Sequence, residues 1–296
     1  MILRNIFFYF AGIVFLTLAK IKNIFKGYSS PKPFGMSEIE RCTEYDINVV
    51  DKWLLHLQEY LGSSDFVKGK NILELVPGSD LGAGIYLLFK GGAKYNAYDV
   101  NNLTQFTPDN FYKQFLNRLK EIGGKSNLDY LEEEVVKFKS GDFSRLNYLV
   151  RKDFDIVSAF GPATIDLVFS QAAFEHFDNV DDTIKQMSVV CKPGSVLIAE
   201  IDLKTHSRYI RDKDPNNIYR YCNLIYNMFW FRGRPNRVRP FQYKESLLRN
   251  GWVDIVIKPF STIRSRDRKQ LALNKNFVNE KNQMDYLTIM LCARKA

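Results

Sequence analysis

Two acidic residues follow apolar runs at positions where proteins often hold a nucleotide-like ligand. Glu74 lies in the run at 72–75, which leads into a turn made by Pro77 and Gly78. Asp99 ends the next apolar run, about 20 residues beyond the turn, where a carboxylate can accept both hydroxyls of a ribose. The glycine allows the backbone to come close to a ligand. The pattern therefore predicts half of a nucleotide-binding α/β unit.

The turn sequence separates two classes of nucleotide ligand. Dinucleotide binding uses G-x-G-x-x-G, with the pyrophosphate on the helix N-terminus, but this chain has Val76 where the first glycine would stand. The carboxylate of Glu74 would repel a pyrophosphate, whereas it suits an ammonium group. Both observations favour S-adenosylmethionine, which carries an amino acid and a sulfonium but no phosphate. An ordinary strand-turn-helix crossover without a ligand is the alternative.

A second set of motifs lies downstream. The apolar run at 165–170 is followed by QAAFEHF, and a Lys-Pro-Gly turn leads into the run at 195–201. Together with ILELVPG, AYDV and SGDFSRL, these motifs stand in the order found in class I S-adenosylmethionine-dependent methyltransferases, which the chain resembles over roughly residues 70–205. The resemblance implies a cofactor site formed by Glu74, Val76, Pro77, Gly78, Asp99, Val100, Asn101, Asp142, Phe143, Ser170 and Gln171.

The same resemblance implies the fold. We expect an α/β protein with a Rossmann-like doubly wound sheet, a C-terminal antiparallel strand at residues 286–293 and an N-terminal hydrophobic helix. The chain then divides into a membrane-associating helix at residues 1–26, a linker at 27–45 and a methyltransferase domain at 46–296, with a substrate-binding insertion at about 203–245.

The third strand of this sheet has two candidate positions in the sequence. We place it at residues 135–138, so that it ends before Asp142 on the adenine side of the cofactor. A strand at 154–157 is the alternative, and it would put Ser158 and Ala159 beside the adenine. The stretch between Asp142 and the run at 165–170 is longer than usual in the family.

Composition narrows the range of functions. The 296 residues suit one catalytic domain with additions, and the four cysteines lack C-x-x-C or zinc-finger spacing. We therefore expect free thiols in a reducing compartment and no metal motif. The net charge of +9 is uneven, with seven arginines between Arg208 and Arg239. A solvated basic surface, an anionic substrate, an anionic membrane or nucleic acid would each explain them. No nucleic-acid-binding motif accompanies them, so we expect no nucleic-acid partner.

The N-terminal segment is almost wholly apolar from Ile6 to Ala19, with lysines after it. Fourteen helical residues extend about 21 Å, which is short of a hydrocarbon core of about 30 Å. A signal peptide, a short spanning helix, an interfacial helix and a core helix are the alternatives. We favour membrane attachment by this helix with the catalytic domain in the cytoplasm, because lysines mark the cytoplasmic side and the cofactor is cytosolic.

Candidate catalytic residues lie where the fourth and fifth strands should end. A hydroxyl acceptor benefits from a general base within hydrogen-bond reach. We expect His206 to be that base and Asp202 to orient it or the acceptor, since ligands of such sheets lie beyond the carboxyl ends of the strands. His176 is the rival base, and a reaction without a side-chain base is the third alternative.

Residues after the fifth strand should select the substrate. Asn236, Arg237 and Arg239 could grip a carboxylate or phosphate, because arginine binds such groups bidentately; ion pairing with the domain's own acids is the alternative. The segment is similar to methyltransferases associated with bacterial surface-polysaccharide gene clusters, which implies a saccharide or glycolipid acceptor. A lipid or isoprenoid-like acceptor, an inactive scaffold and RNA methylation are the other hypotheses.

Overall fold

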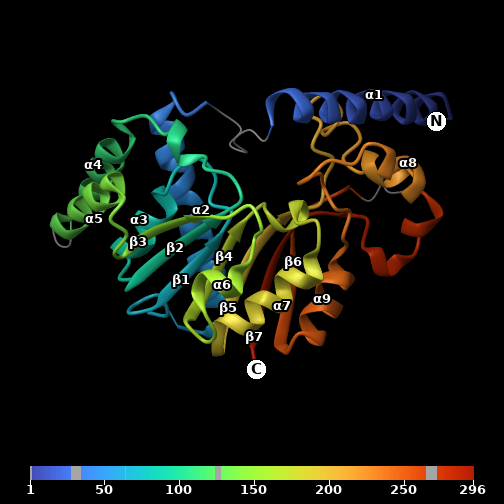
Figure 1. The fold of residues 1–296 in the computed structure, drawn as a ribbon. Coiled ribbons are helices and arrows are strands. Elements are labelled where there is room, and N and C mark those ends of the chain that lie inside the picture. Colours follow the sequence, from blue (N-terminus) through green and yellow to red (C-terminus); the bar gives the residue numbers. More distant parts are fainter. Residues whose placement is uncertain (1, 28–34, 64, 124–127, 265–271) are drawn as a thin grey trace.

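The computed structural model describes residues 2–27, 35–63, 65–123, 128–264 and 272–296 (Figure 1). Its strands are β1 Asn71–Leu75, β2 Lys94–Asp99, β3 Leu146–Val150, β4 Ile165–Gln171, β5 Cys191–Asp202, β6 Trp252–Thr262 and β7 Tyr286–Lys295. Its α-helices are α1 Ile2–Lys26, α2 Ile39–Leu61, α3 Gly82–Phe89, α4 Phe111–Gly123, α5 Asp129–Ser140, α6 Ile156–Phe160, α7 Val180–Val190, α8 Asn223–Met228 and α9 Pro240–Arg249.

The strands form one seven-stranded sheet in the order β3-β2-β1-β4-β5-β7-β6. Strands β1 to β5 run parallel, and β7 pairs antiparallel with both β5 and β6. The central parallel strands are buried on both faces, which is why they read as continuous apolar runs. This is the predicted Rossmann-like sheet with antiparallel strands at its C-terminal end.

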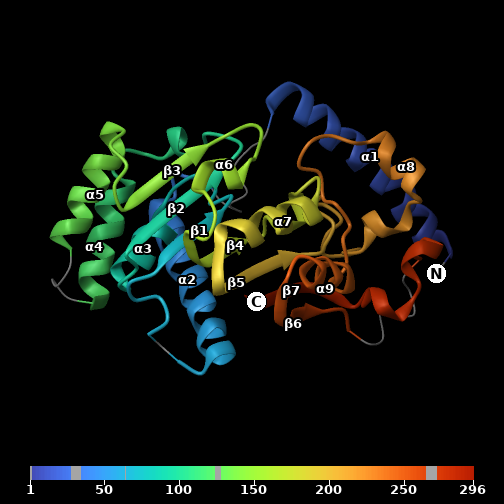
Figure 2. The same ribbon diagram turned by 60° about the horizontal axis from the view of Figure 1, so that its bottom comes forward.

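Helices cover both faces of the sheet (Figures 1 and 2). One core packs α2, α3 and α4 against the sheet, with Trp53 of α2 stacked on Phe169 of β4 at 4.9 Å between ring centroids. The other core packs α6, α7 and α9 against the opposite face. The parallel strands therefore end at one common edge, where β1, β2 and β4 present the residues that follow them.

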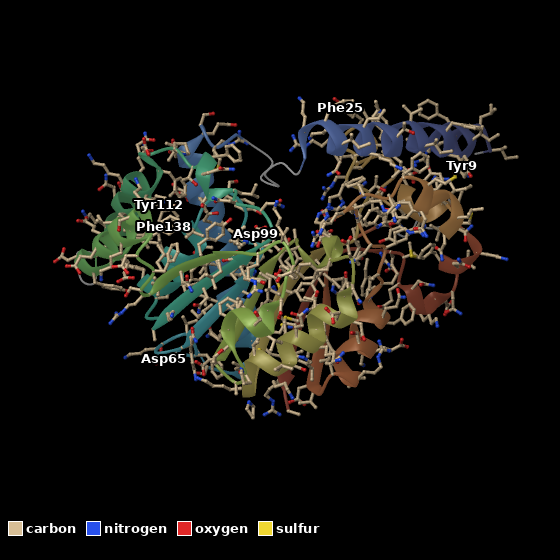
Figure 3. All side chains as sticks on the ribbon, in the orientation of Figure 1. Tyr9, Phe25, Asp65, Asp99, Tyr112 and Phe138 are labelled. Atoms are coloured by element: carbon tan, nitrogen blue, oxygen red, sulfur yellow. The ribbon has the colours of Figure 1, made fainter. Side chains whose placement is uncertain are left out.

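The third strand lies at neither expected place. Residues 135–138 belong to helix α5, where Leu131 and Val135 are spaced to pack inward and Gly141 ends the helix with φ of 80°. Phe138 of α5 lies against Tyr112 of α4, with ring centroids 5.9 Å apart (Figure 3). The strand itself is β3, and the alternative segment at 154–157 enters α6 instead.

The N-terminal part also differs in detail from the expected division. Helix α2 begins at Ile39, so it takes up the last residues of the expected linker at 27–45; residues 28–34 lie outside the described residues. All four cysteines are free, as predicted. Helix α1 lies outside the sheet layers and packs on the segment between β5 and α9, where it joins a third apolar cluster around Tyr219, Tyr221 and Tyr226.

Candidate active site

The turn after β1 has a strained backbone at the expected ligand site. Val76 has φ of 58° and Gly78 has φ of 92°, and positive φ is uncommon for a β-branched residue. The backbone N–H of Val76 donates to the Tyr98 carbonyl of β2 at 2.8 Å, which holds the strained residue in place. A β-branched residue thus adopts a glycine-like conformation at the position of the missing first glycine, and such strain often accompanies function.

Asp99 ends β2 beside this turn, and only one of its two carboxylate oxygens accepts a hydrogen bond within the described residues. Its Oδ1 accepts a hydrogen bond from the Asn101 N–H at 2.9 Å. Its Oδ2 is buried and has no hydrogen-bond partner among the described residues, although Asp99 is only 1% exposed. Burial raises the pKa of Asp99 to about 6. A buried acceptor without a donor is costly, so this oxygen is suited to ligand hydroxyls.

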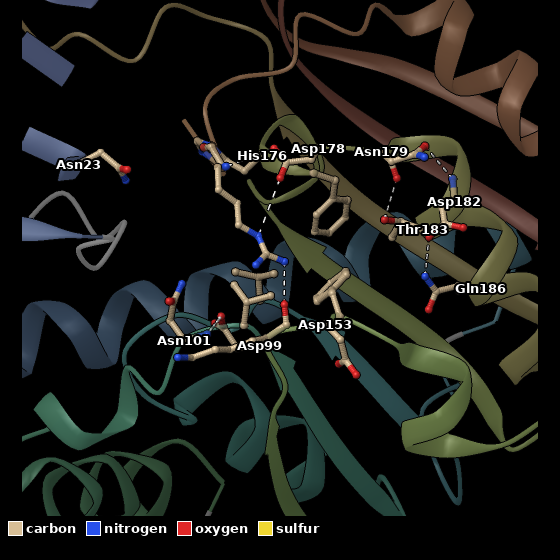
Figure 4. A pocket seen from close by; sticks show the side chains of 17 residues that line it. Asn23, Asp99, Asn101, Asp153, His176, Asp178, Asn179, Asp182, Thr183 and Gln186 are labelled. Atoms are coloured by element: carbon tan, nitrogen blue, oxygen red, sulfur yellow. Dashed lines mark hydrogen bonds and ion pairs between the residues drawn. The ribbon is translucent and has the colours of Figure 1, made fainter. Parts of the chain in front are cut away.

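A cavity of about 420 Å³ opens beyond Asp99 (Figure 4). Val76, Asp99, Val100 and Asn101 form one side of it. The opposite sides are formed by residues that follow β3 and β4, together with Asn23 of α1. These residues include Lys152, Asp153, Phe154, His176, Phe177 and Asp178. The cavity therefore lies where the carboxyl ends of β1 to β4 converge, as expected for a ligand in an open α/β sheet.

Arg232 crosses this cavity from the segment after β5. Its guanidinium donates to the Lys152 carbonyl at 2.8 Å and lies 3.9 Å from the Asp178 carboxylate. The side chain is largely exposed, so these contacts restrain it weakly. Sequence reasoning missed Arg232, Lys152 and Asp178 as lining residues; for Lys152 the cause is the misplaced third strand.

Glu74 lies below the turn rather than on the cavity wall. Its Oε2 accepts the Tyr95 hydroxyl at 2.6 Å, and both side chains are buried. Burial raises the pKa of Tyr95 well above its ordinary value, and the carboxylates of Glu74, Asp80 and Asp46 add to the rise. Negative charge is therefore concentrated under the turn. Asp46 and Asp80, which sequence reasoning missed, join Glu74 as groups suited to a nearby cation.

Glu175, His176 and His206 form a compact cluster beside the cavity. The two imidazole rings meet edge to face at 4.7 Å, and His206 Nε2 lies 3.9 Å from Glu175 Oε1. The Nδ1 atom of each histidine lies within hydrogen-bond distance of a backbone carbonyl oxygen. His176 Nδ1 is 2.6 Å from the Gly233 oxygen, and His206 Nδ1 is 2.9 Å from the Lys204 oxygen. Both Nδ1 atoms therefore carry the proton, and both Nε2 atoms have a free lone pair.

Burial favours the neutral form of each residue in this cluster. Desolvation lowers the pKa of His206 to about 4, and His176 adds to that fall. Desolvation also lowers the pKa of His176, and burial with Asp202 nearby raises the pKa of Glu175 well above its ordinary value. One ligand atom from each residue lies within 4.8 Å of the others. The cluster can therefore accept a proton, and the same atoms could hold a metal ion.

Asp202 lies next to this cluster but does not hydrogen-bond His206. Its Oδ2 accepts from Arg211 in a close ion pair, and its Oδ1 accepts the Lys204 N–H at 3.0 Å. Asp202 therefore does not orient His206 through a direct hydrogen bond, and its orientation of the acceptor stays a prediction. Asp202 instead fixes the start of the loop whose Lys204 carbonyl orients the imidazole.

Comparison with known proteins identifies the class of chemistry. A family model described as a methyltransferase domain matches residues 110–199. Residues 110–199 therefore carry a methyltransferase domain, which supports an S-adenosylmethionine-dependent methyltransferase. No curated protein gives a significant match to the methyltransferase.

Solved structures share its fold at low identity. An S-adenosylmethionine-dependent methyltransferase from Archaeoglobus fulgidus is 16% identical, over 83% of this chain and 94% of that one, with a TM-score of 0.44. Phosphoethanolamine N-methyltransferase 2 from Haemonchus contortus, bound to S-adenosyl-L-methionine, is 15% identical. The match covers 83% of this chain and 52% of that one, with a TM-score of 0.47. The CurJ carbon methyltransferase is 16% identical over 78% of this chain and 49% of its own, with a TM-score of 0.42. The methyltransferase thus spans about half of the CurJ chain.

The residues around the cavity fit S-adenosylmethionine. Asp99 Oδ2 is the orphaned acceptor that ribose hydroxyls would satisfy, and the Val76–Gly78 turn gives the backbone a close approach. Phe154 and Phe177 supply apolar surface for an adenine on the far side. The carboxylates of Glu74, Asp80 and Asp46 under the turn suit the ammonium group of S-adenosylmethionine. Asp99, Val76, Val100 and Asn101 would therefore hold the cofactor, at positions the sequence had predicted.

Two predicted cofactor contacts are wrong because β3 is not where it was expected. Asp142 and Phe143 precede β3, whereas the cavity lies beyond its carboxyl end at Val150. Both residues are exposed at the opposite edge of the sheet. The segment from Lys152 to Phe154 takes their place on the adenine side. The Gly-Asp pair in SGDFSRL is a helix end rather than a ligand-binding motif.

The predicted contacts after β4 remain predictions. Ser170 is buried and its hydroxyl donates to the Leu75 carbonyl at 3.3 Å, which joins the ends of β4 and β1. Gln171 has a buried Oε1 without a hydrogen-bond partner among the described residues. Gln171 thus offers an acceptor at the same edge as Asp99, whereas Ser170 is used within the protein.

The predicted substrate-binding residues are used inside the protein instead. Arg239 is fully buried and donates to the carbonyls of Asn282, Gln283 and Tyr286. Arg237 is buried against the Tyr226 ring, 4.0 Å from its centroid, and donates to the Tyr221 carbonyl.

Asn236 donates to the carbonyls of Phe174 and Phe177 at 2.7 and 3.1 Å. The three residues therefore do not grip an acceptor. For the two arginines, the alternative of ion pairs with the domain's acids is also wrong, because backbone carbonyls accept most of their hydrogen bonds.

Proposed function

We propose that this methyltransferase methylates a hydroxyl of a saccharide or glycolipid at the cytoplasmic face of a membrane. The observation that carries the proposal is the uncharged pair of histidines beside the cofactor cavity. His176 lines that cavity and His206 packs against His176. A neutral imidazole with a free Nε2 is the group needed to take a proton from a hydroxyl.

The bound cofactor would supply an electrophilic methyl group for in-line transfer. The chain's own residues align the acceptor and remove its proton. We assign the proton to His206 Nε2 because His206 lies just beyond β5, and its Nδ1 is held by the Lys204 carbonyl, which leaves Nε2 as the acceptor. With a pKa of about 4, His206 is a weak base. It therefore accepts the proton as positive charge develops on the acceptor oxygen, not beforehand.

Helix α1 supports the membrane part of the proposal. It is 25 residues long and has the length and composition of a membrane-spanning helix, although a signal sequence or a core helix passes the same test. It carries basic residues but no acid. The cytoplasmic location follows from the cofactor, which is made and used in that compartment. A lipid or isoprenoid-like acceptor is the second candidate, because the exposed apolar side of α1 would place such a molecule equally near.

The test of the proposed base is methyl transfer by full-length protein in vesicles, using labelled S-adenosylmethionine and a panel of lipid-linked saccharides and simple lipids. His206→Ala should reduce turnover at saturating cofactor by about 10²- to 10⁴-fold. His56→Ala is the matched control, since His56 lies on α2 beside Glu59. Near-normal turnover of His206→Ala would remove the base assignment.

Metal dependence is tested in the same assay. We expect turnover to persist after chelation with EDTA, because the proposal needs only proton transfer from the cluster. Loss of turnover in EDTA that a divalent cation restores would assign Glu175, His176 and His206 to a metal centre instead. Methylation of simple lipids alone, without saccharides, would favour the second acceptor class.

A further inference from the structure

Helix α1 is attached to the catalytic domain along one continuous side. The Tyr221 hydroxyl donates to the Tyr9 carbonyl at 2.8 Å, and the Asn217 amide donates to the Phe8 carbonyl at 2.8 Å. About one turn further along α1, Gly12 touches the domain so closely that an added Cβ would lie 1.9 Å from the Asn217 amide oxygen. The absence of a side chain at Gly12 therefore permits this packing.

The attachment extends to both ends of the helix. Arg4 donates to the Lys213 carbonyl at 3.1 Å, and Lys20 donates to the Met228 carbonyl at 2.9 Å. These two anchors are sixteen residues apart in sequence, or about 24 Å along the helix axis. A helix that crossed the bilayer while attached in this way would carry the polar surface of the domain into hydrocarbon, which is strongly unfavourable.

The opposite side of α1 is an exposed apolar stripe. Leu3, Phe7 and Phe10 are 83%, 64% and 62% exposed. The stripe, which we call the outer face of α1, consists of Ile2, Leu3, Ile6, Phe7, Phe10, Val14, Leu18, Ile21, Ile24 and Phe25. Its members recur every three or four residues, so they share one side of the helix. Phe25 projects from this side in Figure 3.

Two exposed side chains of the domain border the outer face. Tyr209 is exposed and stacks on Phe15 of α1, with ring centroids 5.2 Å apart. Met228 is exposed next to the Lys20 anchor. An apolar patch of this size on a single chain marks an interaction site.

Charge decides between a lipid surface and a second copy of the chain. All charged residues of α1 are basic: Arg4, Lys20, Lys22 and Lys26. Two copies meeting through their outer faces would bring only cations together in either direction. Anionic lipid headgroups, in contrast, would neutralise them while the apolar side chains enter the acyl boundary.

The same helix borders the cofactor cavity. Asn23, on the last turns of α1, lines the cavity, across from Asn101 in Figure 4. Figure 1 shows the C-terminal end of α1 nearest the parallel strands, while the rest of the helix lies over the segment that contains α8. A membrane against the outer face would therefore lie close to the mouth of the cavity.

We propose that α1 lies flat in the membrane interface as an in-plane clamp. It would hold the domain by its inner side and the bilayer by its outer face, so that the acceptor reaches the cavity from the lipid surface. This inference rests on the proposed membrane-face function. It replaces the spanning helix considered from the sequence with a helix that only one leaflet contacts.

Depth measurements on anionic phosphatidylglycerol–phosphatidylcholine vesicles test the orientation. Single cysteines at Leu3, Phe10 and Leu18, in a Cys222→Ser background, would carry a nitroxide for depth determination. A flat helix gives similar shallow depths of about 5–10 Å at all three positions. A spanning helix gives a steep gradient, with Phe10 deepest, which would overturn the proposal. Failure to bind vesicles, with dimers forming instead, would assign the outer face to a second copy.

A protease test examines the clamp itself. A specific cleavage site inserted within residues 28–34 allows α1 to be cut from the domain after vesicle binding. We expect the cut domain to sediment with the vesicles, because its contacts with α1 remain. Gly12→Leu should release most of the cut domain, whereas Val14→Leu, on the outer face, should not. Release of the unmodified domain would show that α1 is only a tether.

These readouts need no acceptor and no turnover. An incorrect acceptor assignment would leave the depths and the sedimentation unchanged. Conversely, a spanning or detached helix would be common to His206→Ala and its control His56→Ala, so the comparison of their turnover would still test the base. The clamp and the proposed function can therefore fail separately.

Discussion

The edge of the sheet at β1 and β2 and the segment between β5 and α9 both contain charged residues, but they use them differently. At the sheet edge, Asp99 keeps one buried oxygen without a partner among the described residues. In the segment after β5, Arg239 and Arg237 direct their donors into the protein's own carbonyls. A charged group marks a ligand site when its hydrogen-bonding capacity is left over, not when charge is merely present.

The largest expected effect is the loss of cofactor affinity when Asp99 is replaced, and it tests the ligand-binding role of the sheet edge. Asp99→Ala removes the acceptor for both ribose hydroxyls, and charged hydrogen bonds contribute about 1.5–3 kcal/mol each. We expect S-adenosylmethionine affinity to fall by about 10²- to 10⁴-fold, measured by calorimetry. Asp142→Ala is the matched control and should bind normally. Equal losses in both variants would restore the strand assignment that the structure rejects.

Arg239 should show the opposite behaviour, with a large effect on stability and none on binding. Arg239→Met leaves buried carbonyls without donors, and we expect the free energy of unfolding to fall by about 3 kcal/mol in urea titrations. Cofactor affinity of the folded variant should not change. The exposed Arg232→Met should alter stability by less than about 0.5 kcal/mol. A stable Arg239→Met protein that lost acceptor binding would return Arg239 to the substrate site.

These contrasts explain what could be predicted from the sequence. The strands β1, β2, β4 and β5 were evident because each is a buried run next to a turn. Strand β3 was not, since its burial alternates along only five residues and the neighbouring helix α5 contains an apolar run of similar length. The Gly-Asp pair after α5 then supported the wrong register.

The roles of the arginines could not be inferred from sequence for another reason. Arg239 donates to residues 43 to 47 positions further along the chain, and such contacts leave no local pattern. The same holds for α1, whose apolar residues surround the helix in sequence. Only the packing of Asn217 and Tyr221 against Gly12 divides it into an inner and an outer side.

A smaller effect, on the free energy of unfolding, is expected from Asp99→Asn, which keeps the shape of the side chain but removes its charge. Burial raises the pKa of Asp99 from 3.8 to about 6. The folded protein without cofactor therefore binds this proton more tightly than the unfolded chain, and its stability falls as pH rises from about 4 to 6. Asp99→Asn removes that cost, and we expect a gain of about 2 kcal/mol at pH 7.

Thermal unfolding across pH measures this gain. The advantage of Asp99→Asn should vanish below about pH 4, where the carboxyl is protonated in both states. Cofactor affinity should be weaker in the same variant, so stability and binding would change in opposite directions. A destabilised Asp99→Asn protein at pH 7 would mean that the carboxylate supports the fold rather than the ligand.

The smallest effect concerns the pH dependence of cofactor binding. Protonation of Asp99 removes an acceptor that the ribose hydroxyls need, so affinity should fall as pH drops through about 6. From pH 7 to pH 5 the dissociation constant should rise about tenfold, while Asp99→Asn should bind weakly at both values. Turnover at saturating cofactor should persist to lower pH, because burial lowers the pKa of His206 to about 4. If affinity and saturated turnover instead declined together near pH 6.5, an ordinary histidine would control both, and the separation between the two regions would fail.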